Sequence, residues 1–496
     1  MIPAQGARDM GEGAAMDGED EIRPDLAGCP FGCVPGRGRL RAGRNRAPLA
    51  ALAMAPDMAA EASPLGASDD RRDIDQRKPW ILLRSDPQWR AACLARVAHI
   101  PSGYTYLAQL MGHDLGSSVE AASVPWSRGA EDDTAATPPV RYNLIDNPLT
   151  LETVYGPGPA MLAHVYDPET WLFRLTPGAR LARIYARGLN AVSDPDPRPI
   201  RALYDERNRD SLMLHELVVA WMQFHNRNAR ALMAQGIEPY RAYVLARTHA
   251  VRCWHRIVTE DLLPRFLHPE IAALPAPPRA CELDETTLLH GLCRAFHALP
   301  LAAYALGRSG LHNLGTLLKR GYAVSEAETD WRIDWPLFFG ARPGGPRSGM
   351  SASVAPELRA PVTAAAIIAL DTRSAAEARP LRLGNARIGA ARAALPGDWP
   401  ARLTAARLAA DFAAAHPEAP VALDADALEW GPLYQFLMVE AQVHGQQGGF
   451  GPLGSALLAA SVAGSIRRVV MAAEGPREAG LPRPASMLEL INLVRE

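Results

Sequence analysis

The first candidates for chemistry are polar side chains whose spacing would bring them to one side of a helix. Gln109 and His113 are four residues apart in the segment YTYLAQLMGHDLGSS, so on a helix they share a face. An imidazole titrates near neutral pH and transfers protons readily, although a lone histidine of this kind is more often a structural polar residue. The pair therefore indicates either an acid–base site or a buried polar contact.

Two further segments place polar residues in helical surroundings. The segment YDERNRDSLMLHELVVAWMQFHNR begins with charges at a helix start and ends in His225-Asn226-Arg227, which capping and salt bridges would explain. His297 lies in the largely apolar segment LCRAFHALPLAAY, where a buried histidine needs a partner. It is either a metal ligand or a satisfied core residue.

The elements that position these residues are predicted to be helices. The clearest runs from about Asp210 to Met233, where apolar residues recur three and four apart and form one stripe. Other helical patterns cover 104–113, 240–263, 285–306 and 433–443, whereas alternating strand patterns are scarce. We expect an all-α fold with one large domain over 79–496. Residues 1–78 are rich in Gly, Ala, Pro, Asp and Arg, and are predicted to form a disordered arm.

Composition and charge exclude several classes of function. The chain carries 54 acidic and 52 basic side chains, so its net charge of −2 gives no reason to expect a nucleic acid as partner. Six scattered cysteines favour reduced thiols over a disulfide framework or structural zinc. No run approaches the ~20 apolar residues of a membrane span, and the arginine-rich stretch at 37–46 is a poor signal sequence. We expect a cytoplasmic protein, with secretion as the alternative; the oligomeric state is not indicated.

Taken together and in order, these segments resemble the animal-type haem peroxidases (the peroxidase–cyclooxygenase superfamily), especially their bacterial members. The distal helix of that family is matched by Ala108 to Asp114, and its catalytic arginine motif by Asp205 to Asp210. A long helix ending in HNR follows, and the proximal-ligand segment is matched by Cys293 to His297. Weaker similarities are LETVYGPGP, IDWPLFF, and PLYQFLMVEAQ with GPLG after it. The resemblance covers most of residues 100–490.

The resemblance implies a haem b between a distal and a proximal helix. His113 would exchange protons with hydrogen peroxide, Arg207 would stabilise developing charge, and Gln109 would hold distal water or a halide. His297 would be the proximal iron ligand. The haem partners implied by the resemblance are Asn385 beside His297 and, for the propionates, Arg294 and Arg387.

Several positions depart from the family pattern. The residue just before the distal histidine, a haem-linking carboxylate in many relatives, is Gly112, and the other linking position carries Asp210 in place of Glu. We therefore expect noncovalent haem, or one ester link through Asp210, and a weaker oxidant suited to bromide, iodide, thiocyanate or aromatic donors. The family also binds calcium beside the distal histidine; the matching oxygen donors are Asp114, Asp146, Thr150 and Glu152, with less charge than usual.

The sequence accordingly predicts a peroxidase that reduces hydrogen peroxide and oxidises a small organic donor, a halide or a pseudohalide. One alternative is a fatty-acid dioxygenase of the same superfamily, but the position of its radical-bearing tyrosine, three before the proximal histidine, carries Arg294. The other is a haem-binding protein that has lost turnover, for which the altered calcium loop and the missing carboxylate are the reasons.

Overall fold

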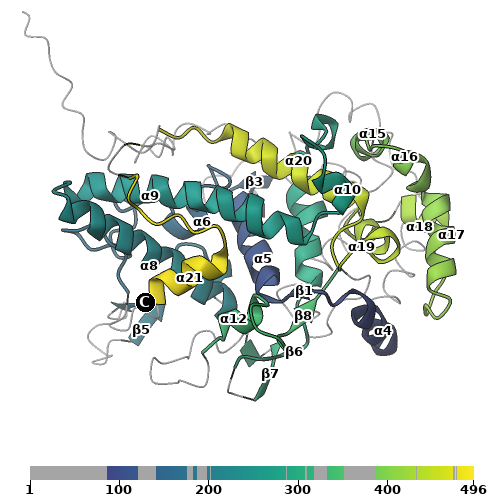
Figure 1. Ribbon diagram of the computed structural model, residues 1–496, viewed down its shortest axis with the longest axis horizontal. Helices are drawn as coiled ribbons and strands as arrows, with labels where there is room; N and C mark the ends of the chain where they lie inside the picture. The colour runs from purple at the N-terminus through teal and green to yellow at the C-terminus, as the bar shows by residue number, and fades with distance from the viewer. Residues whose placement is uncertain are drawn as a thin grey trace, which may run out of the picture.

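The computed structural model describes residues 86–120, 141–175, 183–186, 198–201, 203–209, 211–285, 287–307, 310–314, 316–317, 332–350, 386–429, 431, 433–472, 475 and 478–495. The predicted arm over 1–78, and the cysteines within it, lie outside these residues. No helix among them is long and apolar enough to span a bilayer. Helices carry most of the described chain, which confirms the predicted all-α class (Figure 1).

The α-helices are α4 (Pro87–Val97), α5 (Gly103–Leu115), α6 (Glu152–Tyr155), α7 (Glu206–Arg209), α8 (Leu212–Ala234), α9 (Pro239–Arg256), α10 (Pro269–Ala272), α12 (Trp335–Phe338), α15 (Ala386–Ala393), α16 (Trp399–Arg402), α17 (Ala405–Ala415), α18 (Ala425–Glu429), α19 (Leu433–His444), α20 (Pro452–Arg468) and α21 (Met487–Arg495). The π-helices are η3 (Ile257–Leu262) and η6 (Thr287–Leu292), and the 3-10 helices are η4 (Leu263–Arg265), η5 (Arg279–Cys281) and η7 (Cys293–Ala298).

The strands are short and pair only two by two in the described ranges. They are β1 (Ile100–Pro101) with β8 (Arg347–Ser348), β2 (Ser118–Glu120) with β3 (Arg141–Asn143), β4 (Arg183–Ala186) with β5 (Arg198–Arg201), and β6 (Ala303–Ala305) with β7 (Leu311–Asn313). All four pairs are antiparallel.

Four predicted helices are confirmed, and two of them begin where the local sequence supplies a cap. The helix expected over 210–233 is α8; the Oγ of its N-cap residue, Ser211, accepts a hydrogen bond from the Leu214 N–H. The 240–263 pattern is α9 continued by η3 and η4; Pro239 opens it, and the Glu238 carboxylate accepts two N–H groups. The patterns over 104–113 and 433–443 are α5 and α19.

The single long helix predicted over 285–306 is wrong in its second half. Residues 287–292 form the π-helix η6, and residues 293–298 form the 3-10 helix η7. Residues 303–305 form strand β6. Pro300 explains the early end, because proline has no N–H to continue a helix and disfavours helical backbone in the residue before it.

Helix α5 lies at the centre of the molecule, enclosed by the other elements (Figure 1). It packs against α8, α6, η3 and η7, and α8 runs side by side with α9. At its first residue the backbone approaches α12 closely, since a Cβ on Gly103 would lie 2.9 Å from the Phe338 carbonyl oxygen. The core therefore forms around the helix that bears His113.

The four cysteines of the described chain, Cys93, Cys253, Cys281 and Cys293, are buried and lie in no disulfide. Their reduced state stays a prediction.

Candidate functional site

Helix α5 places polar side chains in the core. All 13 of its residues are buried, and its chemistry-bearing side chains include Gln109, His113 and Asp114. A buried polar group costs free energy unless it is hydrogen-bonded, so each of these side chains requires a partner supplied by another element.

His113 is bound through its Nδ1 atom. The Asn208 Oδ1 atom lies 2.7 Å from this nitrogen, and the His113 residue is 7% exposed. Burial, and next the positive charge of Arg207, lower the pKa of His113 to about 4. The imidazole is therefore neutral at neutral pH and can accept a proton.

Arg207 binds both a carboxylate and the end of α5. Its guanidinium donates to Asp205 through Nε at 2.9 Å and Nη2 at 2.6 Å, and to the Gly116 and His113 carbonyls at 2.7 and 2.9 Å. A cation at the last carbonyls of a helix is stabilised by the helix dipole. Although burial raises it, the charge of Arg207 lowers the pKa of Asp205 to about 2.

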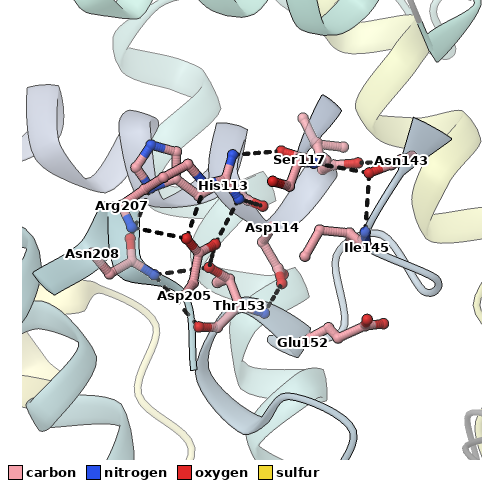
Figure 2. A network of polar contacts seen from close by, with 12 residues as sticks. His113, Asp114, Ser117, Asn143, Ile145, Glu152, Thr153, Asp205, Arg207 and Asn208 are labelled. Atoms are coloured by element: carbon pink, nitrogen blue, oxygen red, sulfur yellow. Dashed lines mark hydrogen bonds and ion pairs between the residues drawn. The ribbon is translucent and has the colours of Figure 1, made fainter. Parts of the chain in front are cut away.

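Sequence analysis missed two members of this site, Asn208 and Thr153. The Asn208 Nδ2 atom lies 2.8 Å from the Thr153 hydroxyl, which lies 2.7 Å from the Asp205 carboxylate. Figure 2 shows that these side chains connect Arg207 with His113 beneath the end of α5. Asn208 stands inside the matched arginine motif, but no spacing signal links it to Thr153, which is 55 residues earlier.

The segment expected to carry the proximal ligand lies directly against α5. The Gln109 Nε2 atom donates to the Phe296 carbonyl at 3.3 Å, and a Cβ on Gly112 would lie 3.7 Å from the Cys293 Cβ. The structure thus brings Gln109 and His113 together with η7, the element that contains His297. The His297 side chain lies outside the described part of the structure.

Of the predicted haem partners, Arg294 lies near His113, whereas Arg387 is bound to another residue. Arg294, on η7, is close enough for its charge to lower the pKa of His113, although less than burial and Arg207 do. Arg387, on α15, forms an ion pair with Asp284 at 3.2 Å, and its side chain is 42% exposed. Asn385 and Asp210 lie outside the described residues.

The predicted calcium ligands use their oxygens for hydrogen bonds. The Asp114 carboxylate accepts the N–H groups of Leu151 at 2.8 Å, Thr153 at 3.2 Å and the Trp254 indole at 2.9 Å. Both Glu152 oxygens accept from residues 146 and 147, and the Thr150 hydroxyl donates to a backbone carbonyl.

Calcium requires six to eight oxygen ligands around one point. The N–H hydrogens around Asp114 occupy the place that a cation would need, and no group of three or more His, Cys, Asp or Glu in the described chain could hold a metal ion. Asp146 is partly exposed, and its backbone N–H donates to the Glu152 carboxylate. The donor set does not fit calcium.

The loop before α6 is held in a strained conformation by the same carboxylate. Leu149 and Leu151 have φ angles of 60° and 56°, a region that costs a side-chain-bearing residue free energy. The Leu151 N–H binds the Asp114 carboxylate, and the Leu149 carbonyl lies 2.7 Å from His255 Nε2. These contacts fix the loop that delivers Thr153 to the site.

The HNR sequence, at 225–227, connects helices and loops; it does not end the helix as expected, because α8 continues to Ala234. The Asn226 side-chain amide accepts the Phe173 N–H at 2.8 Å and donates to the Phe173 carbonyl at 2.9 Å. His225 Nδ1 lies 3.1 Å from the Tyr155 hydroxyl, and Arg227 donates to the Leu493 carbonyl. Neither the predicted capping nor a salt bridge explains these residues, which instead tie α8 to other segments.

The site fits a haem in its donor chemistry. One helix presents a neutral imidazole and an amide, and the element packed on it carries Arg294 and the backbone of His297. At Gln109 the two elements are in direct hydrogen-bonded contact.

Comparisons with known proteins bear on the fold. No protein-family model matches the chain, and no curated protein matches it. Among solved structures, peroxidase A from Dictyostelium discoideum superimposes with a TM-score of 0.53 and 10% identity over 80% of this chain and 85% of that one. A fatty acid alpha-dioxygenase from Oryza sativa is similar over 84% of this chain and 76% of that one, with 10% identity and a TM-score of 0.46. The mainly helical architecture and the superposition on peroxidase A together show that the chain shares the fold of that peroxidase.

Proposed function

We propose that the chain is a haem-dependent peroxidase that reduces hydrogen peroxide and oxidises a small organic donor, a halide or a pseudohalide. One observation carries the proposal: the buried, neutral His113 is held through Nδ1 on a helix that contacts the segment containing His297. The fold shared with peroxidase A supports it.

His113 would act as the acid–base group. A base with a low pKa stays unprotonated across the neutral range, and its Nε2 atom is the proton acceptor when Nδ1 is hydrogen-bonded as a donor. In the proposed reaction Nε2 takes the proton from one peroxide oxygen and returns it to the other, which leaves as water. His297 would hold the haem, which would supply the electrons for peroxide cleavage and recover them from the donor.

The arginines would supply fixed positive charge. Negative charge develops on the separating oxygens, and a cation that needs no reorganisation lowers that barrier. Arg207 and Arg294 both act on His113 electrostatically, and Arg207 is fixed by Asp205. Asn385 remains a proposed partner of His297, and Arg387 a proposed partner of a haem propionate. Asp210 remains a proposed residue for one ester bond to the haem.

The experiment is haem loading followed by peroxide addition. Wild-type protein, expressed with haem, should show a Soret band and oxidise a colourless reducing donor when peroxide is added. His297→Ala should lose the band, whereas His113→Ala and Arg207→Ala should keep it and react with peroxide about 100-fold more slowly or worse. His99→Ala, an exposed histidine outside the site, is the matched control and should behave as wild type.

Each failure has a distinct meaning. A wild-type protein without a Soret band overturns the proposal, and a band that persists in His297→Ala removes its ligand role. Haem binding without turnover would identify a haem-binding protein. Oxygen uptake with a fatty acid would identify a dioxygenase, which Arg294 at the tyrosine position argues against.

A further inference from the structure

A buried chain of hydrogen bonds runs from Arg207 to His113. Its links are Asp205, Thr153 and Asn208, which are respectively 8%, 1% and 0% exposed (Figure 2). The heavy-atom distances are 2.6 Å from Arg207 to Asp205, 2.7 Å to Thr153, 2.8 Å to Asn208 and 2.7 Å to His113.

The chemistry of each group fixes the direction of donation. Asp205 is ionised beside Arg207, and an ionised carboxylate only accepts, so the Thr153 hydroxyl must donate to it. The same hydroxyl then has only lone pairs for Asn208, which must turn its NH₂ group toward Thr153. The amide oxygen of Asn208 therefore faces His113, where it can only accept.

We propose that Asn208, oriented by Thr153, is a positioning residue that holds His113 as the Nδ1–H tautomer and leaves Nε2 as the proton acceptor. The role rests on the proposed function, because a defined acceptor nitrogen matters where a proton is exchanged with substrate. A neutral amide suits it, since it orients the ring without adding a negative charge that would favour the imidazolium.

The first test reads the tautomer directly in the haem-free full chain. Histidine labelled with ¹⁵N is observed by NMR at neutral pH, and His113→Gln assigns the signal by its loss. Wild type should show the Nδ1–H tautomer. Asn208→Leu, and Thr153→Val, which removes the hydroxyl without changing the shape, should lose this preference, whereas Thr153→Ser should keep it. An Nε2–H signal in wild type, or an unchanged tautomer in both disrupting variants, overturns the proposal.

The second test measures the reaction with peroxide in haem-loaded protein by stopped flow. Asn208→Leu and Thr153→Val should keep the Soret band and react on the order of tenfold more slowly, because part of the population has the wrong nitrogen protonated. Thr153→Ser should react at the wild-type rate. Equal rates in all variants overturn the positioning role even where the tautomer changes.

The two tests separate this inference from the function on which it rests. A wild type that binds no haem or ignores peroxide defeats the proposed function, whereas the tautomer result depends on neither. If Asn208→Leu does not fold, the Thr153→Val and Thr153→Ser pair decides the question, because the relay through Thr153 predicts opposite results for them.

Discussion

At the scale of single residues, the charge of Arg207 adds to burial in lowering the pKa of His113. The guanidinium is bound to Asp205 and to the end of α5, so its position is set independently of any ligand. Burial and this fixed charge keep the pKa of His113 at about 4. The imidazole is thus available as a base over an unusually wide acidic range.

The acid limit of the peroxide reaction should follow this pKa. In haem-loaded wild type the rate should fall as pH drops through about 4, because a protonated His113 cannot accept a proton. In Arg207→Gln the limit should move to higher pH, since a charge that lowers the pKa is lost and Asp205, whose charge raises it, remains. Stopped-flow rates at a series of pH values measure both limits.

The exposed Arg256, paired with Glu260, provides the control. Arg256→Gln should leave the limit where it is in wild type. A limit that stays in place in Arg207→Gln as well would show that another group controls it.

At the scale of elements, the Asp114 carboxylate on α5 joins the segment from 146 to 155, which ends in α6, to α9. Asp114 receives N–H groups from the loop and from the Trp254 indole, 140 residues away in sequence. Leu149 and Leu151, whose φ angles are positive, lie in the same loop. Through these hydrogen bonds Asp114 holds the loop against both helices.

Chelation should therefore leave the stability of the protein unchanged, whereas loss of the Asp114 carboxylate should lower it. The melting temperature should be the same with and without EDTA. Asp114→Asn should destabilise the chain by about 1–3 kcal/mol, because an amide offers one acceptor atom where two carboxylate oxygens take three N–H groups. Thermal unfolding followed by circular dichroism measures both, and a melting temperature that EDTA lowers and calcium restores would contradict this account.

At the scale of the whole molecule, haem should hold the two halves of the site together. A ligand that binds only the folded chain stabilises it, by about 2.7 kcal/mol when its free concentration is ~100 times Kd. Haem loading should raise the melting temperature of wild type and of His99→Ala. It should not raise that of His297→Ala, and a rise there would place the iron ligand elsewhere.

The helical architecture was predictable because apolar periodicity and caps are local. The pattern around α8 gave its limits within a few residues. The 285–306 pattern concealed the π-helix and the 3-10 helix before Pro300 and the strand after it. Periodicity identifies a buried face, but it does not distinguish between kinds of helical turn.

The site was predictable only where residues stand within one motif. Gln109 and His113 share a helix, and Asp205 and Arg207 are two residues apart. Thr153 and Trp254 reach the site through tertiary packing, over separations of 52 and 140 residues from their partners Asp205 and Asp114. The donor directions in the network depend on three-dimensional contacts, which no single-sequence pattern contains.

The pairing of β1 with β8 has a consequence for synthesis of the chain. Ile100 and Pro101, directly before α5, find their partners at Ser348 and Arg347, and α5 begins against α12. A ribosome exposes these partners only after more than two hundred further residues have been added. The helix that carries His113 cannot reach its final setting on a shorter nascent chain, so the site is completed late in translation and the proposed haem would bind after that point.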